Sequence, residues 1–215
     1  MRKNNSEQLN FENFSQLREY FLGKNKIFFK EDDIGFHEII SKNMIENIMN
    51  LTEQLDLFMY DFFQNHNFDY HKNSKCGCHI LSSLFCLSDP SWNLIQGGYK
   101  FQKKNNPLYH SWLEKDGIVY DPAMKVVTAK ELYDQYFFSK YCYNKEELIT
   151  LLKRTGTFTY YEEDIERGCV NPLGKLFYYD TKMAESATNN ILDSLENYFH
   201  QKTKQMTWIF KDTIL

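Results

Sequence analysis

Residues 109–123 have the sequence YHSWLEKDGIVYDPA. The segments on either side of Asp116-Gly117 are rich in aromatic and β-branched residues, which are typical of strands. Asp-Gly is one of the dipeptides preferred in two-residue hairpin turns. We therefore predict two antiparallel strands, within residues 107–114 and 118–121, that are joined by this turn.

A two-residue turn would also decide which side chains share a face of the hairpin. It places Trp112 opposite Asp121 and His110 on the diagonal to Asp121, about 7–8 Å away between backbones. An imidazole and a carboxylate can form a hydrogen bond across that diagonal. A loop one residue longer or shorter would turn Asp121 to the other face, so the prediction depends on the register. Taken alone, His110 fits a half-buried histidine and Asp121 a turn former before Pro122.

Upstream, residues 78–88 (CHILSSLFCLS) are predicted to form a buried helix that ends at Asp89-Pro90. Cys78 would stand at its N-terminus, where the helix dipole and free backbone N–H groups favour a thiolate and can stabilise an oxyanion. A free cysteine is also a common small core residue. Cys76 is the alternative nucleophile, although it would lie just outside the helix.

The hairpin resembles the His/Asp hairpin of transglutaminase-like cysteine enzymes, in which H-x-W, a short turn and D-P follow one another. Residues 78–82 resemble the opening of the papain catalytic helix, and residues 95–99 (IQGGY) look like the strand that precedes the His strand in bacterial members. The resemblance covers roughly residues 70–125. It implies a papain/transglutaminase-like fold, with the cysteine helix packed on a small antiparallel sheet that bears the histidine and the aspartate.

The resemblance also implies a role for each site residue. Cys78 would be the nucleophile, His110 the general base and acid, and Asp121 the carboxylate that orients His110. Asn73 is the nearest amide to the oxyanion-donating glutamine of papain-like enzymes, although its spacing differs. Trp112 is a second candidate for positioning the oxyanion or the substrate.

The remainder of the chain predicts an α+β protein with extra helices at both ends. We expect one domain over residues 1–215, with a helical part at 1–70, the catalytic helix and strands at 71–125, and a mainly helical part at 126–215. Further predicted elements are an amphipathic stretch within 1–36, a helix at 37–65, a strand at 93–102, helices at 128–139 (capped by Thr128), 145–154 and 184–201, and a terminal strand at 206–215.

The composition indicates which kinds of partner and which cellular compartment to expect. A net charge of −4 argues against an electrostatically driven nucleic-acid binder. No apolar run is long enough to span a membrane, and the first residues lack the apolar core of a signal peptide. Five cysteines do not suggest a disulfide framework. We expect a cytoplasmic protein. Secretion by a route that needs no signal peptide is the alternative.

These patterns predict a thiol-dependent acyl-transfer enzyme that acts on an amide bond of a protein or peptide, most simply a cysteine peptidase or amidase. A glutamine deamidase or transglutaminase is the enzymatic alternative, and a non-catalytic interaction module is the alternative of another class. No cofactor or metal is expected. Cys76, Cys78 and His79 lie close together, but a zinc site would need a second ligand pair at a defined spacing.

Overall fold

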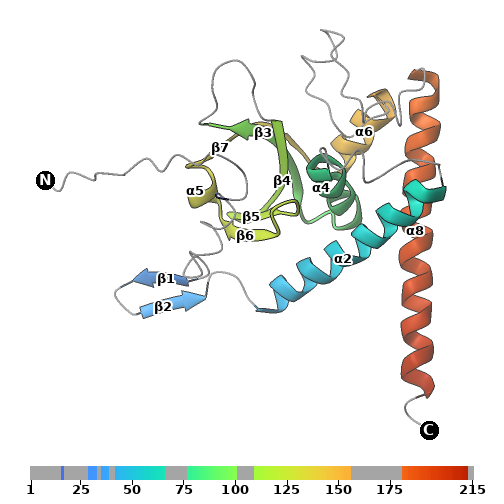
Figure 1. Ribbon diagram of the computed structural model, residues 1–215, viewed down its shortest axis with the longest axis horizontal. Coiled ribbons are helices and arrows are strands. Elements are labelled where there is room, and N and C mark those ends of the chain that lie inside the picture. Colours follow the sequence, from blue (N-terminus) through green and yellow to red (C-terminus); the bar gives the residue numbers. More distant parts are fainter. Residues whose placement is uncertain are drawn as a thin grey trace, which may run out of the picture.

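The computed structural model describes residues 16, 29–32, 35–38, 42–65, 77–100, 109–155 and 181–212. The fold is α+β, as predicted, with a five-stranded antiparallel sheet and several helices (Figure 1). The elements are β1 (Phe29–Asp32), β2 (Gly35–Glu38), α2 (Lys42–Asn65), α4 (Gly77–Ser88), β3 (Asn93–Tyr99), β4 (Tyr109–Lys115), β5 (Ile118–Asp121), β6 (Val126–Ala129), α5 (Lys130–Tyr133), β7 (Phe137–Tyr143), α6 (Lys145–Thr155) and α8 (Thr181–Asp212).

The predicted hairpin is confirmed as β4 and β5, with the register expected from a two-residue turn. Leu113 pairs with Tyr120 and Lys115 with Ile118. Asp116 and Gly117 have φ of 49° and 78°. Positive φ at both central residues is the signature of a type I′ turn, whose twist matches that of the strands it joins.

The hairpin lies in the middle of the sheet, whose strand order is β6-β5-β4-β3-β7. β3 pairs with β4 on one side and with β7 on the other, and the β3–β7 register shifts between Gln96 and Gly97. A Cβ atom on Gly97 would lie 1.9 Å from the carbonyl oxygen of Phe138 and 2.6 Å from the ring of Trp112. Only glycine therefore fits at this irregularity.

The two faces of the sheet support two separate clusters of buried side chains. Leu94, Leu113, Tyr120 and Val127 form one row across four strands and pack with residues of α2 and α4. The other cluster lies with α5 and the start of β7, and its members are Ile95, Trp112, Val119, Met124, Val126, Tyr133, Tyr136 and Phe137. Alternate residues of a strand face opposite sides, so His110 belongs to the face of Trp112.

Helices α2, α4, α6 and α8 pack around the first of these clusters (Figure 1). Helix α4 is buried along most of its length, as its sequence predicted. Helix α6 confirms the helix predicted at 145–154, and a reciprocal pair of bonds fixes its start: each backbone N–H of Asn144 and Glu147 donates to the other's side chain at 2.9 Å. No helix in the described ranges combines the length and hydropathy needed to cross a bilayer.

The predicted helix at 128–139 is wrong. Thr128 does not cap a helix: it lies in β6 opposite Val119, and the residue before α5 is Ala129, which makes no side-chain cap bond. The helix has only four residues, and the chain then turns into β7. The closely spaced aromatic residues of this segment suit a strand as well as a helix, and pairing of β7 with β3 decided between them.

Two further boundaries differ from the prediction. The helix expected to begin at residue 37 begins at Lys42, because β2 occupies Gly35–Glu38 and pairs with β1. The terminal strand expected at 206–215 is also wrong, since α8 continues to Asp212. The amphipathic stretch expected within 1–36 falls almost wholly outside the described residues, as do Asn73 and Cys76.

Candidate active site

The structure brings together Cys78, His110 and Asp121, which lie on three separate elements. Cys78 is the second residue of α4, His110 the second residue of β4, and Asp121 the last residue of β5. His110 and Asp121 are buried, whereas Cys78 is half-buried. Of the other predicted site residues, Trp112 lies beside them, and Asn73 is outside the described residues.

The imidazole of His110 donates from Nε2 to Oδ2 of Asp121 at 2.6 Å. The two-residue turn creates this contact because it places both side chains on one face. Because Nε2 of His110 is bonded to Asp121, Nδ1 is the ring nitrogen that is available to the thiol. A carboxylate in this position fixes the tautomer of the imidazole and stabilises its protonated form.

The carboxylate of Asp121 is itself held by two further donors. Tyr133 donates its hydroxyl to Oδ2 at 2.8 Å, and the backbone N–H of Met124 donates to Oδ1 at 3.0 Å. Asp121 therefore accepts three hydrogen bonds from described residues while it is fully buried. Such bonding compensates for the loss of water around a charged group.

Two histidines determine the charge state of Cys78. Burial alone would raise the pKa of the thiol, but the positive charges of His79 and His110, and hydrogen bonds to both rings, lower that pKa well below its usual value. For His110 the balance runs the other way: burial would lower its pKa, but Asp121 and Cys78 raise the pKa to about 10. Both shifts favour a thiolate–imidazolium pair at neutral pH.

His79 is a feature that the sequence reasoning missed as part of the site. Its Nδ1 is hydrogen-bonded to the hydroxyl of Ser111 at 2.6 Å, and the ring is buried. Ser82, one turn further along α4, donates its hydroxyl to the backbone carbonyl of Ser111 at 3.2 Å. The first turn of α4 is thereby attached to β4 directly beside His110. The adjacency of His79 to Cys78 was the only available signal.

The start of α4 also supplies backbone donors beside the sulfur of Cys78. The first four N–H groups of a helix lack intrahelical acceptors, and the dipole is positive at this end. No acidic residue lies in the first turn to compete for these donors. An oxyanion that forms next to Cys78 would meet these groups.

Aromatic rings enclose the buried side of His110. The ring centroids of Trp112 and Phe137 lie 6.2 and 5.4 Å from that of His110. The indole N–H of Trp112 donates to Glu114 Oε1 at 3.0 Å, so this N–H bonds along its own strand. The rings exclude water from the His110–Asp121 bond, which strengthens it.

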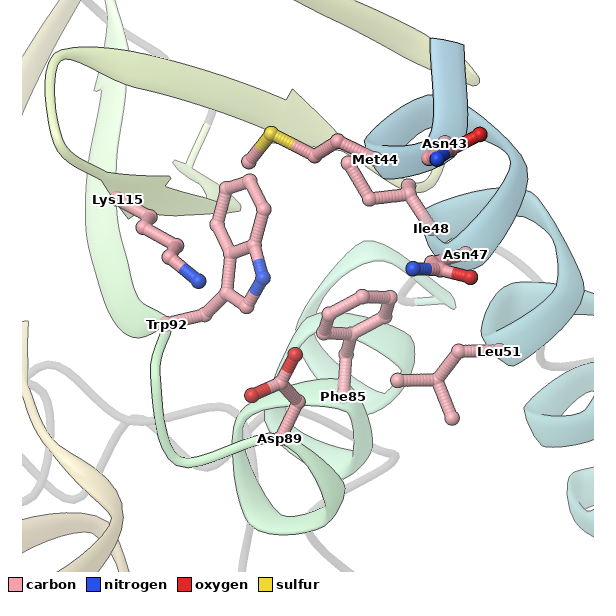
Figure 2. A pocket seen from close by; sticks show the side chains of 9 residues that line it. All are labelled: Asn43, Met44, Asn47, Ile48, Leu51, Phe85, Asp89, Trp92 and Lys115. Atoms are coloured by element: carbon pink, nitrogen blue, oxygen red, sulfur yellow. The ribbon is translucent and has the colours of Figure 1, made fainter. Parts of the chain in front are cut away.

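A cavity of about 340 Å³ lies at the other end of α4 (Figure 2). Its lining includes the apolar side chains of Ile48, Phe85 and Trp92 and the charged side chains of Asp89 and Lys115. Phe85 is seven residues from Cys78 along the helix, or roughly 10 Å. The cavity is therefore distinct from the site around Cys78.

The remaining cysteines and acidic groups provide no metal centre in the described parts of the chain. There, no three His, Cys, Asp or Glu side chains gather in a way that could hold a metal ion. Cys86 is buried in the first core cluster and Cys142 is exposed on β7.

Comparison with protein-family models, curated proteins and solved structures finds no significant match to this chain.

Proposed function

We propose that the protein is a thiol-dependent acyl-transfer enzyme that acts on an amide bond, with a papain/transglutaminase-like arrangement of Cys78, His110 and Asp121. The observation that carries the proposal is the placement of a half-buried thiol at a helix N-terminus beside an imidazole that is bonded to a buried carboxylate. The same three residues have the order and types that the resemblance of the sequence implies.

In the proposed acylation step, the thiolate of Cys78 attacks the carbonyl carbon of the amide. The negative charge passes to the carbonyl oxygen, which the backbone N–H groups at the start of α4 stabilise. The C–N bond then breaks, and the protonated ring of His110 gives its proton to the departing amine. A thioester on Cys78 and a neutral His110 remain.

In the deacylation step, water attacks the thioester and His110 takes a proton from it. The C–S bond breaks, a carboxylic acid is released, and the thiolate–imidazolium pair forms again. An amine in place of water would give a new amide, which is the transglutaminase outcome. We favour hydrolysis because water is abundant and an amine acceptor needs its own binding site.

The first experiment tests whether Cys78 is an activated thiol. At pH 6, iodoacetamide should label Cys78 much faster than Cys142, although Cys142 is the more exposed of the two. Partial burial of the sulfur and the charges of Glu114 and Glu147 raise the pKa of Cys142. Exposure alone would therefore make Cys142 react faster, whereas thiol acidity makes Cys78 react faster. Peptide mapping by mass spectrometry gives both rates from one sample, and equal or reversed rates would contradict the proposal.

The second experiment tests amide chemistry. A mixed protein substrate such as casein is incubated with the chain in water containing 18-oxygen, with and without a fluorescent primary amine. Hydrolysis gives new termini that carry the heavy oxygen, deamidation gives ammonia and labelled side-chain carboxylates, and transglutamination gives fluorescent substrate. Each activity should be lost in Cys78→Ala and in His110→Ala. If Cys78 is an activated thiol but no acyl transfer occurs, the non-catalytic interaction module is the better description.

A further inference from the structure

We propose that Tyr133 is a positioning residue of this site, whose hydroxyl shares the Asp121 oxygen that faces His110 and so limits the attraction of that carboxylate for the imidazolium. The inference builds on the proposed function, because it assigns a fourth residue to the same site.

The hydrogen-bond geometry distinguishes Tyr133 from a packing residue. Its hydroxyl and the ring of His110 both donate to the same oxygen, Oδ2 of Asp121, at 2.8 and 2.6 Å. The third donor, the N–H of Met124, occupies the other oxygen at 3.0 Å. Tyr133 and His110 therefore share one acceptor, the carboxylate oxygen that orients the imidazole.

The surroundings hold the phenol of Tyr133 in place. Its ring stacks on Phe137 with centroids 4.4 Å apart and contacts Trp112 at 5.2 Å. Both Tyr133 and Asp121 have no exposed surface. The phenol cannot exchange this partner for water, so the bond to Asp121 is a fixed part of the site.

Helix α5, which carries Tyr133, is attached to the catalytic hairpin at its other end. The backbone N–H of Lys130 donates to the carbonyl of Gly117 at 2.8 Å, and the ammonium of Lys130 bonds Glu114 of β4 at 2.9 Å. A four-residue helix has little stability of its own. Its attachment at both ends places Tyr133 opposite the end of β5.

A donor that shares an oxygen with His110 has a predictable effect on the imidazole. The bond from Tyr133 disperses negative charge from Oδ2, and so weakens the attraction of the carboxylate for the imidazolium. Among the described residues, Cys78 and Asp121 also act on the charge of His110, and His79 acts on that of Cys78. Removal of the hydroxyl leaves these groups in place and concentrates the charge of Asp121 on His110.

The test compares Tyr133→Phe with the wild-type chain labelled with 15N-histidine. The ring nitrogens of His110, assigned with His110→Gln, are titrated by NMR, and Cys78 alkylation is followed over the same pH range. Tyr133→Phe keeps the stacked ring and should move the alkaline titration of His110 upward by about 0.5 to 1 pH. Tyr136→Phe, a substitution in the same buried cluster, should leave it unchanged.

The direction of the shift in Tyr133→Phe distinguishes the proposed role of the hydroxyl from simple packing. A phenol with only a structural role would loosen the contact between Asp121 and His110 when changed, and the titration would move downward. A downward shift or no shift overturns the role assigned to Tyr133. If His110 of the wild-type chain titrates at its ordinary pH and Cys78 reacts only as an ordinary thiol, the proposed function itself fails. The two failures are therefore distinguishable.

Discussion

The imidazole of His79 and the hydroxyl of Ser111 lie 2.6 Å apart and join the first turn of α4 to the middle of β4. Each of them is the next residue after a member of the proposed catalytic pair, Cys78 and His110. The bond therefore fixes the helix and the strand relative to each other at the point where the thiol meets the imidazole. Loss of this hydrogen bond should lower the stability of the fold and disturb the alignment of Cys78 with His110.

We expect Ser111→Ala to lower the free energy of unfolding by about 1–3 kcal/mol, because it leaves a buried imidazole nitrogen without its partner. Ser83→Ala is the matched control. Ser83 is equally buried, but its hydroxyl has no hydrogen-bond partner within the described residues. Its removal should cost less than about 0.5 kcal/mol or be stabilising. Urea denaturation measures both, and equal losses would argue against a special role for the Ser111 bond.

His79→Gln should make Cys78 a weaker acid, because it removes one of the two positive charges that lower the pKa of the thiol. The acid limb of the iodoacetamide rate would then move to higher pH. Below that limb, each pH unit of movement makes the rate about tenfold lower. His110→Gln serves as the comparison, since it removes the other charge. If the acid limb of His79→Gln lies at the same pH as that of the wild type, His79 does not contribute to the lowered pKa of Cys78.

Gly97→Ala should destabilise the protein by about 2–4 kcal/mol, because an added methyl group would collide with backbone as well as with Trp112. The backbone carbonyl of Phe138 cannot move without opening the β3–β7 pairing. Gly77→Ala is the control: among the described residues, nothing lies within 4 Å of a Cβ placed there. Its stability should be unchanged or higher by up to about 1 kcal/mol. Thermal unfolding of both variants gives the comparison, and similar melting temperatures would contradict the crowding argument.

Asp121→Asn should disable the imidazole while the fold is retained. An amide oxygen carries no full charge, so the pKa of His110 should fall from about 10 toward its ordinary value. We expect the rate of acyl transfer to fall by roughly 10³- to 10⁴-fold, because an amide neither holds the required tautomer of the imidazole nor stabilises the imidazolium. The single-turnover rate with an activated ester measures this. A decrease of less than tenfold would show that Asp121 does not assist His110.

The stability of the protein should depend on the protonation of His110 in a definite direction. Its pKa is raised from 6.5 to about 10 in the folded chain, so its contribution to stability is complete below pH 6.5 and is lost as the pH rises through 10. The difference in unfolding free energy between the wild type and His110→Gln should therefore shrink between pH 7 and pH 10. Denaturant midpoints at several pH values test this, and a difference that grows over that range would contradict it.

Much of the site could be predicted because its geometry follows from one short turn. Asp116 and Gly117 both take positive φ, and a two-residue turn then fixes the register of β4 and β5. That register alone determines that His110 and Asp121 share a face. The position of Cys78 near a helix N-terminus could also be predicted locally, from the apolar sequence that begins at this residue and stops before Pro90.

Other parts could not be predicted because they depend on contacts between distant segments. The aromatic residues near 133–143 fit two periods, and only pairing with β3, some forty residues earlier, made the second half a strand. The role of Tyr133 has the same origin. A tyrosine in an aromatic run carries no local mark that its hydroxyl will meet Asp121.

By itself, the sequence determined the hairpin, its register and the helix that begins near Cys78, since each depends on backbone preferences within a few residues. Tertiary structure alone decided that the helix start lies beside the hairpin, that His79 bonds Ser111, and that Tyr133 bonds Asp121. Local steric rules act on neighbours in the chain, whereas a buried hydrogen bond forms only where packing brings two remote groups together and removes the water between them.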